Sequence, residues 1–522
     1  MNGNRLTRRQ LLGRGGAALG GLVAAGAVGF DLPHGKASGA RGAASGSTPS
    51  PAPAARPAGY APGALVHQFV SRPDLIPPAI SVTTTSEGPI TTPPYILLSS
   101  TGYPTTGPGQ PGNLILDRSG RLVWFKPSGT RSFLGLAAQT YQGKPVLTWW
   151  QGKITNGHGA GEGVIADASY TTINTVQAGN GLMADLHEFA ITALDTALVT
   201  AYSTAPADLT AVGGKADGYV LAGHAQEIDI ATGKVLFQWD SLDHVGVTES
   251  MKSLSGGTKD NPFDYFHINS LALAPDGDLL ISSRNTCTVY KVSRQTGEIA
   301  WRLGGRQSSF EMGPGTRFYF QHHVRPHGAS TLSIFDDGGS PPRLQKVSRA
   351  ILLDIDTVAM SAKLRHAYTH PAGLAAANQG SMQVLPDGRV FVGWGDEPYF
   401  SEFSADGTLK LDGEFPAGDQ SYRAFTADWT GTPGGKPTVR VLGDPAGGRI
   451  AYVSWNGATE VAGWIVRAGP TAASLSEVAR QERTGFETAI AVTSNGPYFA
   501  VTAYDASNAV LGQSATVQIQ RA

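Results

Sequence analysis

Residues 114–124 read LILDRSGRLVW, a short apolar strand, a turn of Asp, Ser and Gly, and a second apolar strand. Apolar runs on both sides of such a turn are typical of an antiparallel hairpin. The pattern recurs near Asp167 and at residues 227–236, 289–301, 351–364 and 400–409. The spacing of roughly 50–65 residues is typical of a propeller with long loops. The sequence therefore predicts an all-β chain with a six-bladed β-propeller over residues 64–432.

A second set of hairpins carries polar side chains at its open ends. Folding the chain back at Pro275-Asp276-Gly277 places His267 beside Arg284. The same construction places His187 opposite Tyr202, His322 opposite Phe335 or Asp336, and Gln379 opposite Trp394 or Gly395. If each hairpin is the inner hairpin of its blade, these groups meet at the mouth of one central channel.

Composition narrows the class of partner. The 522 residues include 40 basic and 41 acidic side chains, for a formal net charge of −1. This balance argues against a nucleic-acid binder or a polybasic membrane-surface protein, and favours a small-molecule partner. The single cysteine, Cys287, excludes an intramolecular disulfide or a thiolate zinc cluster, and we expect it to be a small buried hydrophobe.

The two ends of the chain differ from the middle. Arg8-Arg9 precedes a weakly apolar run from Ala17 to Phe30, which predicts a twin-arginine export signal over residues 1–38 and a secreted protein. The apolar run is shorter than the roughly 20 residues of a comfortable span, so we expect only transient membrane contact during export. Residues 39–63, rich in Ala, Gly, Ser and Pro, predict an unstructured linker. We expect a monomer.

From residue 433 onward the strands are spaced as in a small sandwich. Expected strands lie at residues 437–441, 449–455, 464–467 and 498–504. They predict an immunoglobulin- or fibronectin-III-like domain over residues 433–522. Because it holds no cluster of catalytic residue types, we expect a role in packing or surface attachment.

The candidate site combines three imidazoles with one guanidinium: His187, His267, His322 and Arg284. A guanidinium matches a sulfate, phosphate or carboxylate with two parallel donors. A neutral imidazole is a nucleophile near neutral pH, and a protonated neighbour can protonate a departing phenoxide. The set predicts transfer of an anionic group without metal or cofactor. Three histidines could also hold zinc, but an arginine beside the ligands disfavours a cation.

Several neighbouring residues have lesser predicted roles. Because successive strand residues point to opposite faces, only one of His322 and His323 can face the channel, and His323 is a candidate for substrate binding. Tyr202 and Trp394 are expected to stack on a phenolic ring. Further residues are given structural roles: His158 and His224 in loops or at strand starts, and Asp336-Asp337 as a turn cap.

Six strings in the chain resemble the arylsulfotransferase family, in particular its branch common in actinomycetes and fungi. The strings are DLHEF (185–189), HAQEID (224–229), DYFHINS (264–270), LISSR (280–284), IAWRLGG (299–305) and FQH (320–322). The resemblance covers roughly residues 80–430 and implies a six-bladed propeller. It also implies transfer of a sulfuryl group from a phenolic sulfate ester to another phenol, without a nucleotide sulfate donor.

By this resemblance, His322 is the nucleophile that forms a transient sulfohistidine in a ping-pong reaction. His267 and Arg284 would hold the sulfuryl oxygens, and His187 would assist proton transfer. Family members usually have Asp after this histidine, whereas the chain has His323, so the nucleophile stays open between His322 and His323. Two other classes remain as alternatives: a secreted propeller that binds sulfated ligands without turnover, and a quinone-dependent dehydrogenase. Against the dehydrogenase, this chain lacks the cysteine pair that stacks on the cofactor and the Asp-rich calcium loop of that class.

Overall fold

The computed structural model describes residues 65–85, 92–102, 107–443, 448–494 and 496–519. The predicted export signal (1–38) and linker (39–63) lie outside these residues. Within them the chain is built of β-strands, and the helices are the short segments η1 (Thr210–Val212), α2 (Ser241–His244) and η2 (Val247–Glu249). None of the described helices has the length and apolar character needed to cross a membrane.

The strands upstream of residue 428 form five antiparallel sheets. The first holds β2 (Tyr95–Gly102), β3 (Gly112–Asp117), β4 (Leu122–Pro127) and β26 (Asp419–Ala427). The second holds β5 (Ser132–Tyr141), β6 (Lys144–Thr155), β7 (His158–Ala166), β8 (Thr172–Val176), β9 (Ala184–Ile191), β10 (Thr196–Ala207), β11 (Gly218–Asp229) and β12 (Val235–Asp240). The third holds β13 (Ile268–Leu273), β14 (Leu279–Ser283), β15 (Thr288–Val292) and β16 (Ile299–Gly304).

The other two sheets each gain a short extra strand. One holds β18 (His322–His327), β19 (Thr331–Asp336), β20 (Arg349–Asp356) and β21 (Ser361–Tyr368), with β17 (Glu311–Met312) pairing in parallel with β21. The other holds β22 (Ser381–Val384), β23 (Val390–Gly393), β24 (Tyr399–Phe403) and β25 (Leu409–Glu414), with β1 (Ser81–Thr84) beside β25.

The repeated strand-turn-strand pattern forms hairpins, as the sequence predicts. Each copy forms an antiparallel pair of consecutive strands: β3–β4, β7–β8, β11–β12, β15–β16, β20–β21 and β24–β25. Each lies at the outer side of its sheet, away from the strand that begins the repeat. The pattern therefore marks the outer hairpin of every repeat.

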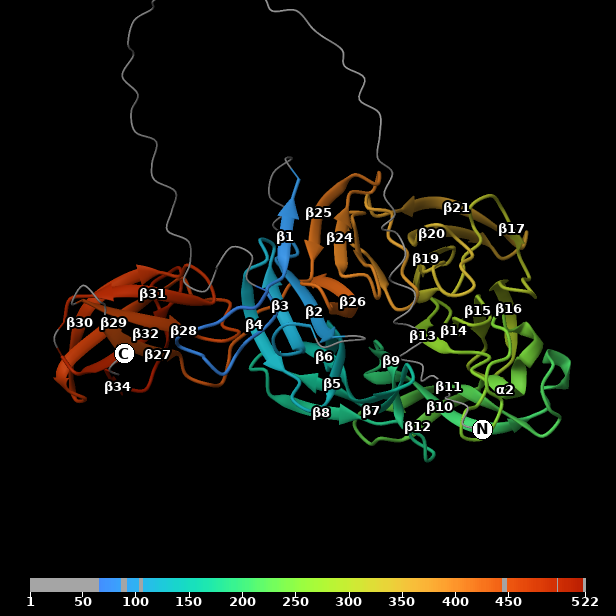
Figure 1. Ribbon diagram of the computed structural model, residues 1–522, viewed down its shortest axis with the longest axis horizontal. Coiled ribbons are helices and arrows are strands. Elements are labelled where there is room, and N and C mark those ends of the chain that lie inside the picture. Colours follow the sequence, from blue (N-terminus) through green and yellow to red (C-terminus); the bar gives the residue numbers. More distant parts are fainter. Residues whose placement is uncertain (1–64, 86–91, 103–106, 444–447, 495, 520–522) are drawn as a thin grey trace, which may run out of the picture. The chain divides into compact units, whose positions relative to one another are not determined.

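The first strands of the repeats contact one another in a closed order. Strand β5 contacts β9, β9 contacts β13, β13 contacts β18, β18 contacts β22, β22 contacts β26, and β26 contacts β5. Strand β26, late in the chain, pairs with β2, early in the chain, so the two ends of this region share one sheet (Figure 1). This closure is typical of a β-propeller, and it places the starts of the inner strands around one axis.

Apolar side chains from neighbouring sheets pack against each other. One cluster joins β13–β16 with β18–β21 through residues such as Leu280, Leu303 and Ile334, all nearly fully buried. Another joins β3 and β4 with β5 to β7 through Ile115, Leu147 and Trp149. Burial of apolar surface between sheets stabilises the arrangement and fixes where each inner strand begins.

The C-terminal strands form two sheets around a separate core. One sheet holds β27 (Thr438–Gly443), β28 (Arg449–Ser454) and β31 (Glu487–Val492). The other holds β29 (Gly463–Thr471), β30 (Ser474–Glu482), β32 (Tyr498–Tyr504), β33 (Val510–Gln513) and β34 (Val517–Gln518). Val453, Trp464 and Phe499 belong to one buried cluster that both sheets share, so the predicted strands pack as a two-sheet sandwich.

Candidate active site

The starts of three inner strands bring the three predicted histidines together. His187 lies in β9, His267 directly precedes β13, and His322 is the first residue of β18. The Nε2 atoms of His187 and His267 are 3.2 Å apart, and one ring nitrogen of each of the three histidines lies within 4.8 Å of the others. His322 pairs with Phe335, and the Arg284 N–H donates to His267 O, as the predicted hairpins require.

The backbone around these histidines is unusual. His267, Phe320 and Gln379 have φ angles of +56°, +56° and +73°. Side chains other than glycine rarely adopt this left-handed region, which costs energy that the surrounding structure must supply. His267 directly precedes β13, and Phe320 and Gln379 lie two residues before the first residues of β18 and β22.

Each histidine has a carboxylate on its Nδ1 atom. Asp264 Oδ2 lies 2.6 Å from His267 Nδ1, Asp337 Oδ2 lies 2.8 Å from His322 Nδ1, and Asp185 Oδ2 contacts His187 Nδ1. These partners orient the rings so that the Nε2 atoms are left for the site. Sequence reasoning missed all three. The assignment of Asp337 as a turn cap is wrong, because its carboxylate bonds to His322.

The hydrogen bonds of His322 define its tautomer. Nδ1 faces two acceptors, Asp337 Oδ2 at 2.8 Å and Phe320 O at 3.1 Å, so it carries the hydrogen. Nε2 accepts the backbone N–H of Gln379 at 3.3 Å, so it holds a lone pair. Burial, followed by the charge of Arg284, holds the pKa of His322 well below its ordinary value. His322 is therefore a neutral imidazole with a nucleophilic Nε2 atom.

His187 and His267 share one hydrogen. Both Nδ1 atoms face carboxylates, so a hydrogen bond between the two Nε2 atoms requires a proton on one of them. Burial lowers the pKa of His267 to about 3, because the opposing carboxylate of Asp264 only partly offsets burial and neighbouring His187 and His158 act in the same direction as burial. Because His267 Nδ1 is bonded to Asp264, the geometry makes His187 Nε2 the donor to His267 Nε2 and makes His187 the candidate proton donor.

Arg284 lies beside this cluster with its Nε atom unpartnered. Its Nη1 donates to Asn285 Oδ1 at 2.7 Å, and its Nη2 donates to Ser340 Oγ and Ala377 O, both at 2.8 Å. The guanidinium also lies over the ring of Phe320, 5.2 Å from its centroid. Arg284 is buried and its Nε–H donor has no partner among the described residues. A buried unpaired donor is costly, so the site favours an oxyanion there.

Two aromatic rings and a fourth histidine lie around the three-histidine cluster. The Tyr202 hydroxyl donates to Ile268 O at 2.5 Å, and its ring centroid lies 6.0 Å from that of His187. Tyr422 is absent from the predicted set, and its ring centroid lies 5.8 Å from that of His187. His158, expected to be structural, has its ring 4.9 Å from His267 and its Nε2 3.4 Å from Asp264 Oδ2. Sequence spacing carried no signal for Tyr422.

Two other predicted residues lie elsewhere. Trp394 is fully buried among Phe335, His370 and Phe403, and its Nε1–H donates to Ser401 Oγ at 2.9 Å. His323 contacts Met382 O through Nδ1 at 3.1 Å and packs on Phe425. A β-bulge after His322 separates the two adjacent histidines. The structure brings neither Trp394 nor His323 into contact with the three-histidine cluster.

A buried ion-pair network supports the cluster from β9, β18 and β26. Glu188 forms ion pairs with Arg325 and Arg423, both at 2.8 Å, and accepts the Leu271 N–H at 3.2 Å. Arg423 also donates to His187 O at 2.7 Å. The network therefore ties the backbone that carries His187 to the inner strands β13, β18 and β26.

The three imidazoles must also be tested as a metal site. Their positions and their carboxylate partners on Nδ1 are compatible with zinc. However, His322 Nε2 accepts an N–H from Gln379, and the charge of Arg284 acts on the same imidazole. A cation there would be repelled by this guanidinium, whereas an anion would be attracted. We therefore assign the position to an anionic group.

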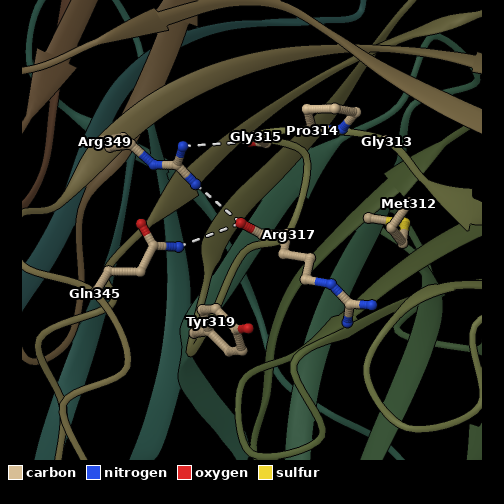
Figure 2. Close-up of a pocket in the computed structure, with 8 residues that line it drawn as sticks. All are labelled: Met312, Gly313, Pro314, Gly315, Arg317, Tyr319, Gln345 and Arg349. Carbon is tan, nitrogen blue, oxygen red and sulfur yellow. Dashed lines mark hydrogen bonds between the residues drawn. The ribbon is translucent and has the colours of Figure 1, made fainter.

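A separate hollow lies on the outer side of the β17–β21 sheet. Its lining includes Arg317, Tyr319, Gln345 and Arg349, and both Gln345 and Arg349 donate to Arg317 O (Figure 2). None of the three histidines lines it. The chemistry described above is therefore not located in this hollow.

The imidazoles and the guanidinium of this all-β ring suit a protein that transfers an anionic group. The model of the family "Arylsulfotransferase (ASST)" matches residues 137–416, more than half of the chain. The chain belongs to the arylsulfotransferase family. The match supports aryl sulfotransferase activity, with phenols and aryl sulfates as substrates. A comparison with curated proteins found no match.

Solved structures share only a distant likeness. A protein of unknown function from Bacteroides caccae is 10% identical, with a TM-score of 0.36, covering 61% of this chain and 93% of that chain. Periplasmic gluconolactonase from Pseudomonas aeruginosa is 14% identical, with a TM-score of 0.34, covering 81% and 96%. Virginiamycin B lyase from Staphylococcus aureus is 8% identical, with a TM-score of 0.24, covering 64% and 84%. Likeness at this level says nothing about the reaction.

Proposed function

We propose that the protein transfers a sulfuryl group from a phenolic sulfate ester to an acceptor phenol through a sulfohistidine at Nε2 of His322. One observation carries this proposal: His322 is a buried neutral imidazole whose Nδ1 carries the hydrogen and whose Nε2 lone pair faces the site. His323 lacks this arrangement, so we assign the nucleophile to His322. The reaction needs no nucleotide sulfate donor and no metal.

The surrounding residues have complementary tasks in this reaction. Arg284 offers its unpartnered Nε–H to a sulfuryl oxygen, and His267, whose Nε2 lies 3.2 Å from His187 Nε2, holds another. His322 attacks sulfur, the ester S–O bond breaks, and His187 gives its shared proton to the phenolate oxygen. In the second half-reaction the acceptor phenol returns a proton to His187, its oxygen bonds to sulfur, and the N–S bond breaks. This sequence predicts ping-pong kinetics.

The test is incubation of the purified protein with a chromogenic aryl sulfate and excess phenol. We expect release of the donor phenol, formation of the sulfated acceptor, and a sulfated peptide containing His322 when the acceptor is withheld. His322→Asn should abolish all three, while His323→Asn should retain turnover. Absence of both products from the wild-type protein would contradict the proposal. Family membership does not favour ligand binding without turnover.

The same proposal extends to architecture and location. The closed order of inner strands supports a six-bladed propeller over residues 64–432, in which the eight-stranded sheet counts as two blades joined by one pair, Gly161 with Ala184. The two-sheet C-terminal sandwich supports an immunoglobulin- or fibronectin-III-like domain over residues 433–522. The Arg8-Arg9 pair and the following apolar run support twin-arginine export of a monomeric enzyme.

A further inference from the structure

The three carboxylates that hold the histidines are not equivalent. Asp185 accepts two backbone N–H groups besides its imidazole, from His187 at 2.9 Å and from Gly159 at 2.5 Å. Asp337 accepts from the ring of His322 alone, its Oδ1 atom is buried without a partner, and neither oxygen pairs with a described lysine or arginine at ion-pair distance. Asp264 also has a buried Oδ1 atom without a partner, but its Oδ2 meets two imidazoles, His267 Nδ1 at 2.6 Å and His158 Nε2 at 3.4 Å. Asp337, which meets one imidazole, is therefore the least satisfied of the three carboxylates as an anion.

We infer that Asp337 is the base that takes the Nδ1 proton of His322 when its Nε2 atom becomes sulfated. This inference rests on the proposed function. It makes Asp337 a positioning residue, because it acts through His322 rather than on the substrate. Asp185 and Asp264 hold their imidazoles differently, as permanent anions that keep the transferable proton on the His187–His267 pair.

The proton movements balance over both half-reactions. When Nε2 bonds to sulfur, a ring that kept its Nδ1 hydrogen would become cationic, and passing that hydrogen to Asp337 Oδ2 keeps the ring neutral. The leaving phenolate takes its proton from His187. In the second half-reaction the N–S electron pair returns to Nε2 and Asp337 gives the proton back to Nδ1. No external acid or base is consumed.

The charges around the three carboxylates agree with this division. Burial raises the pKa of Asp337 well above its ordinary value, helped by Asp396 and Asp336, and Arg284 only partly opposes this. Burial acts in the same direction on Asp185 and Asp264, but the adjoining histidines outweigh it: the pKa of Asp185 is lowered and that of Asp264 is lowered well below its ordinary range. Environments that separate the pKa values of like groups commonly separate acid from base roles.

A pH profile of the first half-reaction tests the inference. The rate of phenol release with no acceptor should rise with pH as Asp337 ionises, because only the carboxylate form can take the Nδ1 proton, and burial raises the pKa of Asp337 while the pKa values of His267, Asp185 and Asp264 are lowered. Asp337→Asn keeps an oxygen that can accept the Nδ1 hydrogen but cannot take the proton. We expect the rate to fall by about 10²–10⁴-fold and the acidic limb of the profile to disappear.

A matched control is Asp412→Asn, because Asp412 holds His370 outside the site at 3.1 Å. Asp412→Asn should keep both the wild-type rate of phenol release and the acidic limb of its pH profile. If Asp337→Asn fails to fold, Asp337→Glu, which retains a carboxylate, should keep the limb with a shifted midpoint. An acidic limb that persists unchanged in Asp337→Asn would overturn the inference. A wild-type protein that releases no phenol would contradict the proposed function instead.

Discussion

Two buried carboxylate–histidine pairs in this ring have different surroundings. At the axis, His322 uses Nδ1 for Asp337 and leaves the Nε2 lone pair toward the site. At the outer strands β21 and β25, His370 uses Nε2 for Asp412 at 3.1 Å and Nδ1 for the Ala372 N–H at 3.1 Å. Both histidines are buried, at 1% and 7% exposure, so burial does not separate them. In both rings the second nitrogen accepts a backbone N–H, so what separates them is what surrounds the ring: a nitrogen of His322 lies within 4.8 Å of ring nitrogens of His187 and His267, and the charge of Arg284 acts on it.

The comparison gives a physical criterion for a reactive histidine. The ring of His370 packs beside Trp394 and Tyr399 like any other buried side chain. An imidazole becomes a candidate for chemistry when one nitrogen is fixed by a carboxylate and the other meets further imidazoles and a guanidinium. The predictions below sharpen or break this criterion.

Removal of the proton donor should have the largest effect. His187→Gln should slow phenol release from phenyl sulfate by about 10²–10⁴-fold, because a poor leaving group needs a proton. The loss should be much smaller with a nitrophenyl sulfate, whose phenolate departs unaided. Initial rates with both donors give this ratio. His370→Gln is the control and should change neither rate. An equal loss with the two donors would show that His187 is not the donor.

Replacement of Arg284 should have the next largest effect on the reaction. Arg284→Lys keeps the charge but loses the planar fork, so kcat/KM should fall by about 10²-fold, comparable to loss of one transition-state donor. Arg302 is a matched control, because it also lies over an aromatic ring, that of Tyr290, and pairs with Glu249. Arg302→Lys should leave kcat/KM within a few-fold. Wild-type kcat/KM in Arg284→Lys would contradict oxyanion binding by Arg284.

Sequence patterns found the fold and most of the cluster for a clear reason. Turns and alternation mark hairpins, and turn positions place His322 opposite Phe335 correctly because register follows from the turn. Asp337 and Tyr422 were missed because they reach the site through a loop and the closing sheet, which no local pattern encodes. Trp394 was expected at the channel because its hairpin ends near it, yet the apolar space between sheets takes the ring.

Buried histidines that stay neutral in the folded state should make the free energy of unfolding fall as the pH is lowered. Burial holds the pKa values of His322 and His323 well below the ordinary value and that of His267 near 3, so these rings stay neutral in the folded state while the unfolded chain binds protons below pH 6.5 or so. The free energy of unfolding should therefore fall with decreasing pH, by about 1.4 kcal/mol per pH unit for each such histidine.

Urea unfolding at neutral pH and near pH 5 measures this slope. Asp337 acts in the opposite sense, because its raised pKa makes the folded state bind a proton first on acidification. Asp396 and Asp419, whose pKa values are raised to about 6, act in the same sense as Asp337, so the contribution of one histidine is measured by comparing the slope of the wild-type protein with that of a histidine variant. His323→Gln should reduce the slope without changing the catalytic groups. A slope that is the same in the wild-type protein and in His323→Gln would show that His323 has the same pKa in the folded and unfolded states.

Chelation should have the smallest effect, and it is the sharpest test of the comparison. If the Nε2 atoms of His187, His267 and His322 held a metal, their carboxylate partners on Nδ1 would suit it equally well. Two contacts oppose that interpretation: the Gln379 N–H donates to His322 Nε2, and Arg284 repels a cation at the same imidazole. Treatment with a strong chelator should therefore leave phenol release unchanged, and metal analysis of the purified protein should find no stoichiometric zinc. Loss of activity that zinc restores would mean that the Nε2 atom of His322 binds a metal rather than attacking sulfur.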